Sequence, residues 1–395
     1  MNETIVVSGM GIITGLGYGK EATITALRSK RSGIGKMHYL NTIHADYPVS
    51  EVKMSDEEMR EFLGIPADKI ITRTPLLGIM AIKEAIKEAQ LEEKRPRRIA
   101  FINGTTVGGM EKSEQYYPEF INTEAYIAAH DCGTSCEAIA ETFDGFDMIT
   151  TISTACSSAA NAIILGANLI KTGRVDAAVV GGTECLSKFH LNGFSTLMIL
   201  DKEPCKPFDA NRVGLNLGEG AAYLVLEKEQ DAKKRGVQPI CKLSGYANTC
   251  DAFHQTASSP DGQGAYLAMR DALEDAKLKP EDIDYINAHG TGTQNNDVSE
   301  GTAIVRIFNE NIPPVSSTKS FTGHTTSAAG SVESVISILA LQHDFIPANL
   351  NFNTPMPELS FTPVKDNITK KLHHVLSNSF GFGGNDSACI FSIIE

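Results

Sequence analysis

Tryptophan is absent from the 395-residue sequence, and no apolar stretch approaches the roughly 18 residues that a membrane-spanning helix needs. The first seven residues carry no basic segment followed by an apolar run, so we expect no signal peptide. Basic residues are also scarce, with 35 Lys and Arg against 48 Asp and Glu and a net charge of −13. This balance argues against a general affinity for nucleic acid or anionic membranes, and an acidic partner would need a local basic patch.

The eight cysteines are spread through a large chain without a signal segment, a pattern typical of reduced thiols in a cytosol. We therefore predict a cytoplasmic protein. Cys132 and Cys136 form a CxxxC pair, but no second ligand pair lies nearby. Packing in a loop or helix is a better interpretation of this pair than metal binding.

An internal repeat organises the chain. The stretch Met80–Leu91 has a helical period and is followed by an apolar strand at Ile99–Ile102 and a Gly/Thr-rich turn. The stretch Leu267–Leu278 has the same period and is followed by a strand at Ile283–Ile286 and a second Gly/Thr-rich turn. This order predicts two α/β halves in which strands alternate with helices.

We place the halves at residues 1–240 and 241–395. Cys156 and His324 fall at equivalent strand-to-helix corners, each followed by small residues and an apolar helix. If the halves pack around a pseudo-twofold axis, these two corners face one another.

Cys156 ends a β-rich run and directly precedes small residues and a long apolar helix at 159–170. We expect the amino terminus of that helix to lower the pKa of the thiol and to favour the thiolate. A thiolate is the form that attacks a thioester. Taken alone, the residue fits a buried cysteine that acts as a small hydrophobe.

Two histidine motifs accompany the cysteine. His289 ends an apolar strand, and Thr291 and Thr293 behind it present hydroxyls that can bind amide groups of an extended ligand. Lys319 lies five residues before His324, and its charge would favour neutral imidazoles. The alternatives are a structural turn for His289 and a surface position for Lys319.

A glycine-rich segment at 378–384 lies close to the carboxyl end. Glycines between phenylalanines suggest a backbone that passes close to a ligand, where an N–H can bind a developing oxyanion. The alternative is a structural turn between core strands.

Together these motifs resemble the β-ketoacyl-acyl-carrier-protein synthases of the elongating Cys-His-His type. The resemblance covers nearly the whole chain, because four further stretches also fit the family: Val6–Thr14, Lys206–Asp209, Leu217–Ala221 and Asp251–His254. It implies a thiolase-like α/β fold with duplicated halves in an α-β-α-β-α layering.

By this resemblance, Cys156 takes an acyl group from the phosphopantetheine arm of an acyl carrier protein. His289 and His324 bind the malonyl thioester carbonyl during loss of carboxylate, and Lys319 supports them with Glu333 as its partner. The other implied positions are Phe382, which supplies an oxyanion N–H with Cys156 and acts as a gate, Val107 in the acyl pocket, and Thr256, Thr291 and Thr293 in the pantetheine tunnel. No metal or nicotinamide cofactor is needed, because decarboxylation drives formation of the carbon–carbon bond.

The chain departs from the family pattern in several places. Asn385-Asp386 stands where the family usually has Thr-Asn, and Thr326-Ser327 where it has Leu-Gly. Leu215, Asn216 and the shortened segment 111–146 fall where the family shapes its acyl pocket and subunit contact. We expect Asn216 to pair with a polar group of an unusual acyl chain or with the partner subunit, which favours a specialised polyene or polyketide pathway. The alternative is that Asn216 faces solvent and the segment is a trimmed loop.

The resemblance also implies a dimer, either of identical chains or with a different partner. The carrier is expected to dock on a basic patch at Lys69, Arg73 and Arg212. Two other functions stay open: a non-catalytic, chain-length-type partner subunit of a heterodimeric synthase, and a thiolase. Such subunits typically lack the cysteine, and the thiolase candidate Cys389 lies inside the apolar run 388–394.

Overall fold

The computed structural model describes residues 4–117 and 124–394. Within these residues most strands form one large mixed sheet, which has the order β4-β3-β5-β6-β1-β7-β13-β12-β8-β9, with β2 paired to β1. Its two arms have the same construction. In each arm three parallel strands form the outer part, and two antiparallel strands lead to the junction of β1 with β7.

The two arms come from successive parts of the chain. The strands of the first arm are β1 (Ile5–Thr14), β2 (Gly17–Tyr18), β3 (Ile99–Gly104), β4 (Met148–Ile152), β5 (Ala177–Glu184) and β6 (Gly220–Lys228). Those of the second arm are β7 (Cys241–Cys250), β8 (Tyr285–Asn287), β9 (Val315–Ser316), β12 (His374–Gly381) and β13 (Asn385–Ser392). This duplication, with the layering below, confirms the predicted fold class.

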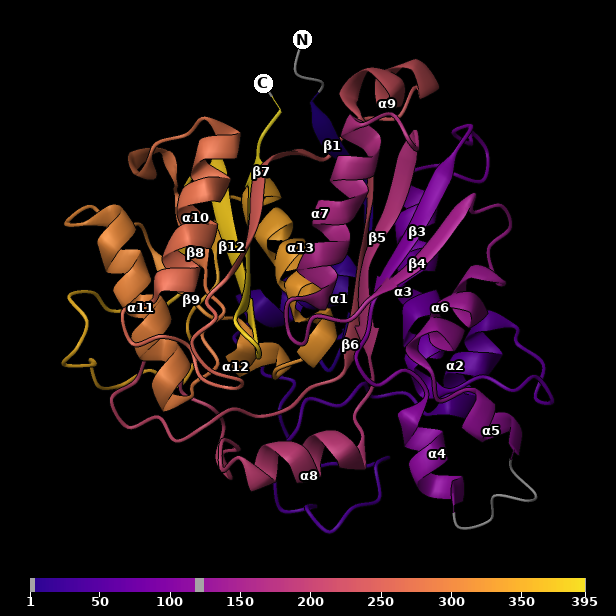
Figure 1. Cartoon of the computed structure of the whole chain (residues 1–395), viewed down its shortest axis with the longest axis horizontal. Coiled ribbons are helices and arrows are strands. Elements are labelled where there is room, and N and C mark those ends of the chain that lie inside the picture. The colour runs from indigo at the N-terminus through magenta and orange to yellow at the C-terminus, as the bar shows by residue number, and fades with distance from the viewer. Residues whose placement is uncertain (1–3, 118–123, 395) are drawn as a thin grey trace.

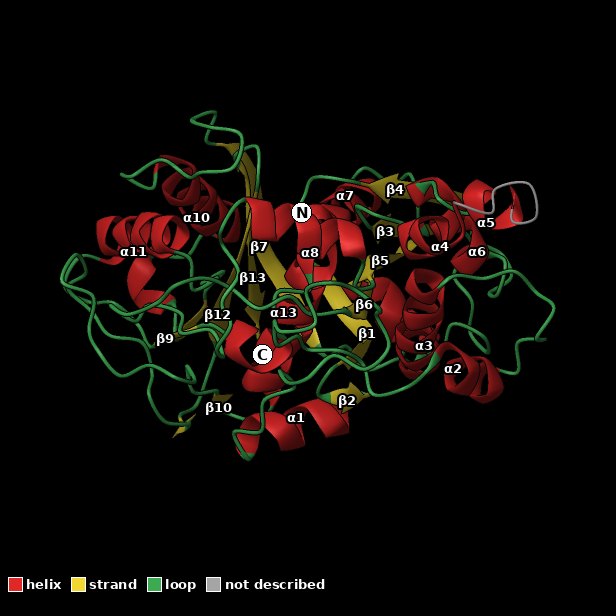
Figure 2. Cartoon of the chain, turned by 90° about the horizontal axis from the view of Figure 1, so that it is seen from below, coloured by secondary structure: helices red, strands yellow, loops and turns green. Residues whose placement is uncertain are grey.

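Helices form three layers around the strands (Figure 1). α7 (Ser158–Lys171) and α13 (Ala329–Gln342) pack against one another between the two arms. α3 (Arg73–Glu88) covers the outer face of β1, β5 and β6, while α10 (Gln263–Ala276) covers β7 and β13 and packs on α11 (Gln294–Phe308). Figure 2 shows α10 and α11 on one flank of the molecule and α2 and α3 on the other.

The predicted helices at 80–91 and 267–278 correspond to α3 and α10, although both begin earlier than expected. The remaining helices are α1 (Lys20–Arg28), α2 (Asp56–Leu63), α4 (Met110–Tyr116), α5 (Glu124–Ala128), α6 (Cys132–Ala140), α8 (Lys188–Thr196), α9 (Glu229–Arg235) and α12 (Lys319–Thr322). A separate pair of short strands joins β10 (Phe345–Ile346) to β11 (Ile368–Thr369). No helix of the described chain is both long and apolar enough to cross a membrane.

Small residues allow the two central helices to approach closely. A Cβ atom at Gly330 on α13 would lie 2.7 Å from the backbone nitrogen of Ala160 on α7. Real Cβ atoms do not approach backbone this closely, so a larger residue at this position would push the helices apart. Because Cys156 precedes α7 and His324 precedes α13, this contact brings the two corners together.

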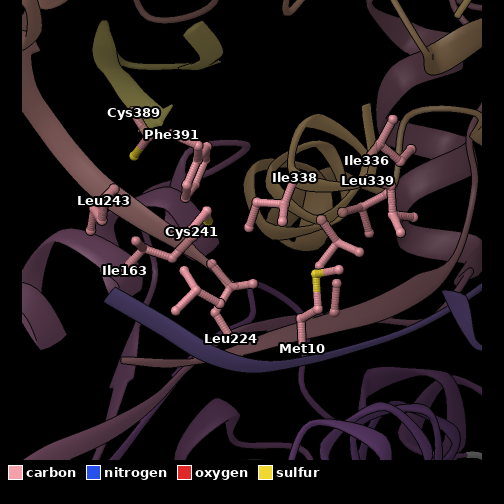
Figure 3. Close-up of a cluster of buried hydrophobic side chains, with 14 of the residues drawn as sticks. Met10, Ile163, Leu224, Cys241, Leu243, Ile336, Ile338, Leu339, Cys389 and Phe391 are labelled. Atoms are coloured by element: carbon pink, nitrogen blue, oxygen red, sulfur yellow. The ribbon is translucent and has the colours of Figure 1, made fainter. Parts of the chain in front are cut away.

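Behind these corners lies a large apolar cluster (Figure 3). Its side chains come from both arms and from both central helices, and include Met10, Leu224, Ile338 and Phe391. Cys389 is part of the same cluster and is buried. Burial raises the pKa of its thiol to about 12. Cys389 therefore has the environment of a core side chain, which argues against the thiolase alternative.

Candidate active site

Cys156 lies at a sharp corner between β4 and α7. Ala155 has a left-handed φ of 51°, which is unusual for a residue with a side chain, and Ser157 is the N-cap of α7. The hydroxyl of Ser379 on β12 donates to the carbonyl of Cys156 over 3.1 Å. The sulfur atom is thereby placed where the two halves of the molecule meet, and Cys156 is only 5% exposed.

His324 faces the cysteine from the other half. Its Nε2 lies 3.1 Å from Sγ of Cys156, within hydrogen-bonding distance for sulfur. Its backbone N–H donates to the carbonyl of Asn216 over 2.7 Å, which fixes the corner before α13. Nδ1 of His324 is buried and has no hydrogen-bond partner among the described residues.

His289 follows β8, and its ring lies edge-on to the ring of His324, with centroids 5.3 Å apart. The carboxylate of Glu300 on α11 accepts from the N–H groups of His289 and Gly290 over 2.8 and 2.7 Å. Asn378 also donates to Glu300 over 3.0 Å. The turn that carries His289 is thus tied to both α11 and β12.

Lys319 supports the histidine pair from a fully buried position. Its Nζ lies 3.2 Å from Nδ1 of His289, donates to the His289 carbonyl over 2.5 Å and forms an ion pair with Glu333 on α13. An ammonium group has no lone pair to accept with, so Nδ1 of His289 must be the acceptor. The proton of the neutral ring then lies on Nε2. The surface position considered for Lys319 is wrong, and its predicted pairing with Glu333 is present.

A pocket of about 470 Å³ leads from the surface to Cys156. Two segments contribute to its wall: the entrance loop, residues 251–259, through residues 256–258, and the glycine-rich turn, residues 381–384. The predicted pantetheine residues all line the pocket: Thr256, Thr291 and Thr293. Cys156, His289, His324 and Phe382 line it as well, while Lys319 and Glu333 lie behind the histidines.

Phe382 lies beside the nucleophile, and its backbone N–H acts to lower the pKa of the Cys156 thiol. Its ring stacks on Phe194 with centroids 5.8 Å apart, and Phe194 in turn meets the buried ring of His190 edge-on. Val107 is buried and is not among the residues that line the pocket. Its predicted place in an acyl pocket therefore stays a prediction.

The pKa of Cys156 differs from our expectation. Burial raises the pKa of the thiol to about 12, although the Lys319 charge and the N–H of Phe382 both oppose this shift. Burial therefore opposes the lowered thiol pKa that we expected from the start of α7. The thiol is neutral at pH 7, and His324 is the base within reach of its proton.

Both histidines are neutral, as we expected. Burial and then the Lys319 charge lower the pKa of His289 and of His324 well below the usual range. A neighbouring histidine lowers each pKa further: His324 acts on His289, and His190 acts on His324. Neutral rings can donate one hydrogen bond each to a carbonyl oxygen.

Asn216 does not reach the pocket or the solvent. Its Oδ1 accepts from the N–H of Cys205 over 2.7 Å, and its Nδ2 donates to the carbonyls of Asp201 and Glu203 over 3.0 and 3.1 Å. Both earlier interpretations of Asn216 are therefore wrong: this amide closes a buried loop and supports His324 through its carbonyl. The segment 111–146 gives no further support, since its residues 118–123 lie outside the described chain.

The prediction of a basic docking patch is also wrong for two of its three residues, because they are buried. Arg73 is buried in ion pairs with Glu219 and Asp56. Arg212 is buried too, and donates to the carbonyls at positions 209, 293 and 294. Only Lys69 is partly exposed. Because buried guanidinium groups with satisfied donors cannot meet a partner, these two arginines hold loops together instead.

Two residues of this site were not identified from the sequence. Glu300 binds the turn of His289, and its signal was an acidic residue in the helix that follows the histidine motif. Phe194 lines the pocket on α8, and an isolated Phe beside a glycine gives no signal on its own. Both act through contacts between segments that are distant in sequence.

The chain is similar to known condensing enzymes. Residues 2–232 match the family model described as "Beta-ketoacyl synthase, N-terminal domain", and residues 240–353 match its C-terminal counterpart. The 3-oxoacyl-[acyl-carrier-protein] synthase 2 of Staphylococcus aureus (strain COL) is 31% identical, with 100% of this chain and 99% of that protein aligned. Putative polyketide beta-ketoacyl synthase 1 of Streptomyces halstedii is 31% identical, over 99% and 98%. The solved structure "The ishigamide ketosynthase/chain length factor" has a TM-score of 0.93, 28% identity and full coverage of both chains.

Proposed function

Since the chain belongs to the β-ketoacyl synthase family, we propose that Cys156, His289 and His324 carry out its condensation chemistry. The enzyme is an acyltransferase that joins a malonyl unit on an acyl carrier protein to an acyl group held as an enzyme thioester. The product is a β-ketoacyl carrier protein of fatty acid or related polyketide synthesis. The observation that carries the assignment of residues is the unbroken series of contacts from Cys156 through His324 and His289 to Lys319 at the inner end of the pocket.

The first half-reaction moves the acyl group. The Cys156 thiol passes its proton to Nε2 of His324, 3.1 Å away, as the sulfur attacks the thioester carbonyl. The N–H groups of Cys156 and Phe382 hold the oxyanion that develops on this carbonyl. Collapse breaks the bond to the pantetheine sulfur, which takes the proton and leaves as a free thiol.

The second half-reaction forms the carbon–carbon bond. Before this step the proton of the neutral His324 ring moves from Nδ1 to Nε2 by exchange with solvent. The malonyl thioester carbonyl then accepts hydrogen bonds from Nε2–H of His289 and of His324, and loss of carbon dioxide leaves an enolate on this thioester. The enolate carbon attacks the acyl carbonyl on Cys156. The Cys156 sulfur leaves as a thiolate and takes up a proton from solvent, which restores the neutral thiol, and the β-ketoacyl product remains on the carrier. Lys319 fixes the His289 tautomer that this step requires, because it occupies Nδ1.

The acyl carrier protein, through its phosphopantetheine arm, is the proposed partner. The threonines at 256, 291 and 293 lie along the pocket where such an arm would bind. We also propose a dimer, a cytoplasmic location, and a division into a half at 1–240 that carries Cys156 and a half at 241–395 that carries the histidines and Lys319.

Intact-mass analysis with a panel of acyl carrier proteins tests the assignment. The wild-type chain should gain one acyl group, and Cys156→Ala should gain none. Cys389→Ala is the matched control, because it removes another buried thiol of similarly raised pKa, and it should still be acylated at Cys156. Acylation that persists in Cys156→Ala would contradict the proposal. The same panel reports which acyl chain the enzyme prefers.

A further inference from the structure

An acidic residue lies close to the active site without a place in the reaction. Asp386, at the start of β13, is only 3% exposed. The pattern that this chain resembles has an asparagine at this position. A buried carboxyl group in place of an amide changes the hydrogen-bonding capacity of the position, because an ionised carboxylate can only accept.

A second carboxyl group lies beside it. Asp251 directly follows β7, the neighbour of β13 in the sheet. A Cβ atom at Gly264 would lie 2.1 Å from Oδ2 of Asp386 and 2.7 Å from Cβ of Asp251, so both acidic side chains pack on the same glycine. Oδ2 of Asp251 accepts from the N–H of Ser259 over 2.7 Å. Its Oδ1 is buried and accepts no hydrogen bond from any residue in the described chain.

The pair lies where the entrance loop meets the glycine-rich turn. The N–H of Asp251 donates to the carbonyl of Gly384, and the N–H of Gly383 donates to the carbonyl of Gln255, both over 2.8 Å. Gly384 has a φ of 79°, and a Cβ atom there would lie 3.0 Å from Cβ of Asp251. The entrance loop and the glycine-rich turn, which both contribute to the pocket wall, are therefore in direct contact, and Phe382 lies in the turn.

The charged groups that face Asp386 are both acidic: Asp251 on the entrance loop and Glu300 on α11. Burial, then Asp251, then Glu300 raise the pKa of Asp386 to about 8. Two ionised carboxylates repel and cannot hydrogen-bond to one another, whereas a single shared proton gives a strong contact. Oδ1 of Asp251, the buried acceptor without a partner among the described residues, would be satisfied by that proton.

We propose that Asp386 is a positioning residue that stays protonated at neutral pH and donates a hydrogen bond to Asp251, holding the entrance loop against the glycine-rich turn. When the proton is lost, like charges push the two segments apart and the pocket wall loosens. The inference rests on the proposed function. It holds that the contact between the two segments keeps the pocket wall in the position that the carrier-bound substrate needs in order to reach Phe382 and Cys156. The enzyme should lose activity as the pH rises through the pKa of Asp386.

Asp386→Asn tests this inference, because the amide donates to Asp251 at every pH. Condensation with carrier-bound substrates would be measured as kcat/KM from pH 6.5 to 9.5. A group with a pKa near 8 that must be protonated predicts about a tenfold fall between pH 7 and pH 9 in the wild type. The variant should match the wild type at pH 7 and should lack this fall. Asp261→Asn, an exposed acid that follows the same loop, is the matched control and should keep it.

Difference infrared spectroscopy gives a second measurement that does not depend on activity. The wild type at pH 7 should show the carbonyl band of a buried neutral carboxylic acid, and this band should vanish in Asp386→Asn. An Asp386 that is ionised at pH 7, or an alkaline fall that persists in the variant, would overturn the inference. Neither result affects the proposed function, which would fail only if the wild type did not acylate or condense at pH 7.

Discussion

Removal of the Lys319 ammonium group should damage both stability and chemistry. Lys319 and Glu333 are almost completely buried and form an ion pair, and Lys319 also contacts the ring and carbonyl of His289. Lys319→Met leaves the Glu333 carboxylate in the core without its counter-charge. Breaking a buried pair in this way costs about 3–5 kcal/mol of folding free energy. Glu333→Gln should also lower the free energy of unfolding, because it leaves the buried Lys319 ammonium group without its counter-charge.

The double variant Lys319→Met/Glu333→Gln should recover part of this loss, because it leaves no unpaired charge. An exposed pair in the same chain provides the control: Lys30 and Asp366 form an ion pair at the surface, and Lys30→Met should cost less than about 1 kcal/mol. The assay is equilibrium urea unfolding of the four variants and the wild type. If the two single losses simply add in the double variant, the two groups are not coupled and this reasoning fails.

Removal of the Lys319 charge should also shift the pKa of His289 upward. Burial first, and then the Lys319 charge, keeps the pKa of His289 low. Without Lys319 only the second contribution disappears, so the pKa of His289 should rise but remain below its usual value of about 6.5. A protonated ring cannot be the neutral donor described above. The pH dependence of malonyl decarboxylation should therefore gain an acid limb at a higher pH in Lys319→Met than in the wild type. Identical acid limbs would show that Lys319 does not set the state of His289.

Two further predictions concern the same region. His289→Ala and His324→Ala should each reduce condensation by about two to four orders of magnitude and reduce self-acylation less, measured by product formation and intact mass; near wild-type condensation would mean that the histidines are structural. Asn216→Ala should lower the free energy of unfolding by about 1–3 kcal/mol without changing the order of preference among acyl chains, because the amide bonds only to the protein. A changed chain preference in this variant would restore the pocket interpretation.

Sequence and structure agree where a local pattern carried the information. Hydrophobic periodicity predicted the helix before β3 and the helix before β8, and tertiary packing only shifted their ends. The repeat predicted that Cys156 and His324 occupy equivalent corners, and Nε2 of His324 does lie against the sulfur. Equivalent corners of duplicated halves meet when they lie close to the axis between the halves, and the contact of α7 with α13 places these two corners there.

Patterns of charge and polarity were less informative, because a sequence does not state what surrounds a side chain. Arg73 and Arg212 carry the charge expected of a docking patch, but partners from distant segments bury them. Asn216 is polar in a stretch that the family resemblance placed at the pocket, yet its donors and acceptor close a loop. Burial, not residue type, decided the role of each of these three side chains.

The sequence by itself therefore determined the α/β halves, the condensing-enzyme family and the candidate residues, since periodicity, repeats and spaced motifs are properties of the chain alone. Only the tertiary structure decided the ionisation and orientation of those residues. It made the Cys156 thiol neutral against the expected effect of the helix, oriented His289 through Lys319, and placed Asp386 beside Asp251. These outcomes depend on desolvation and on charges a few ångströms away, and those are set by segments that are brought together only when the chain folds.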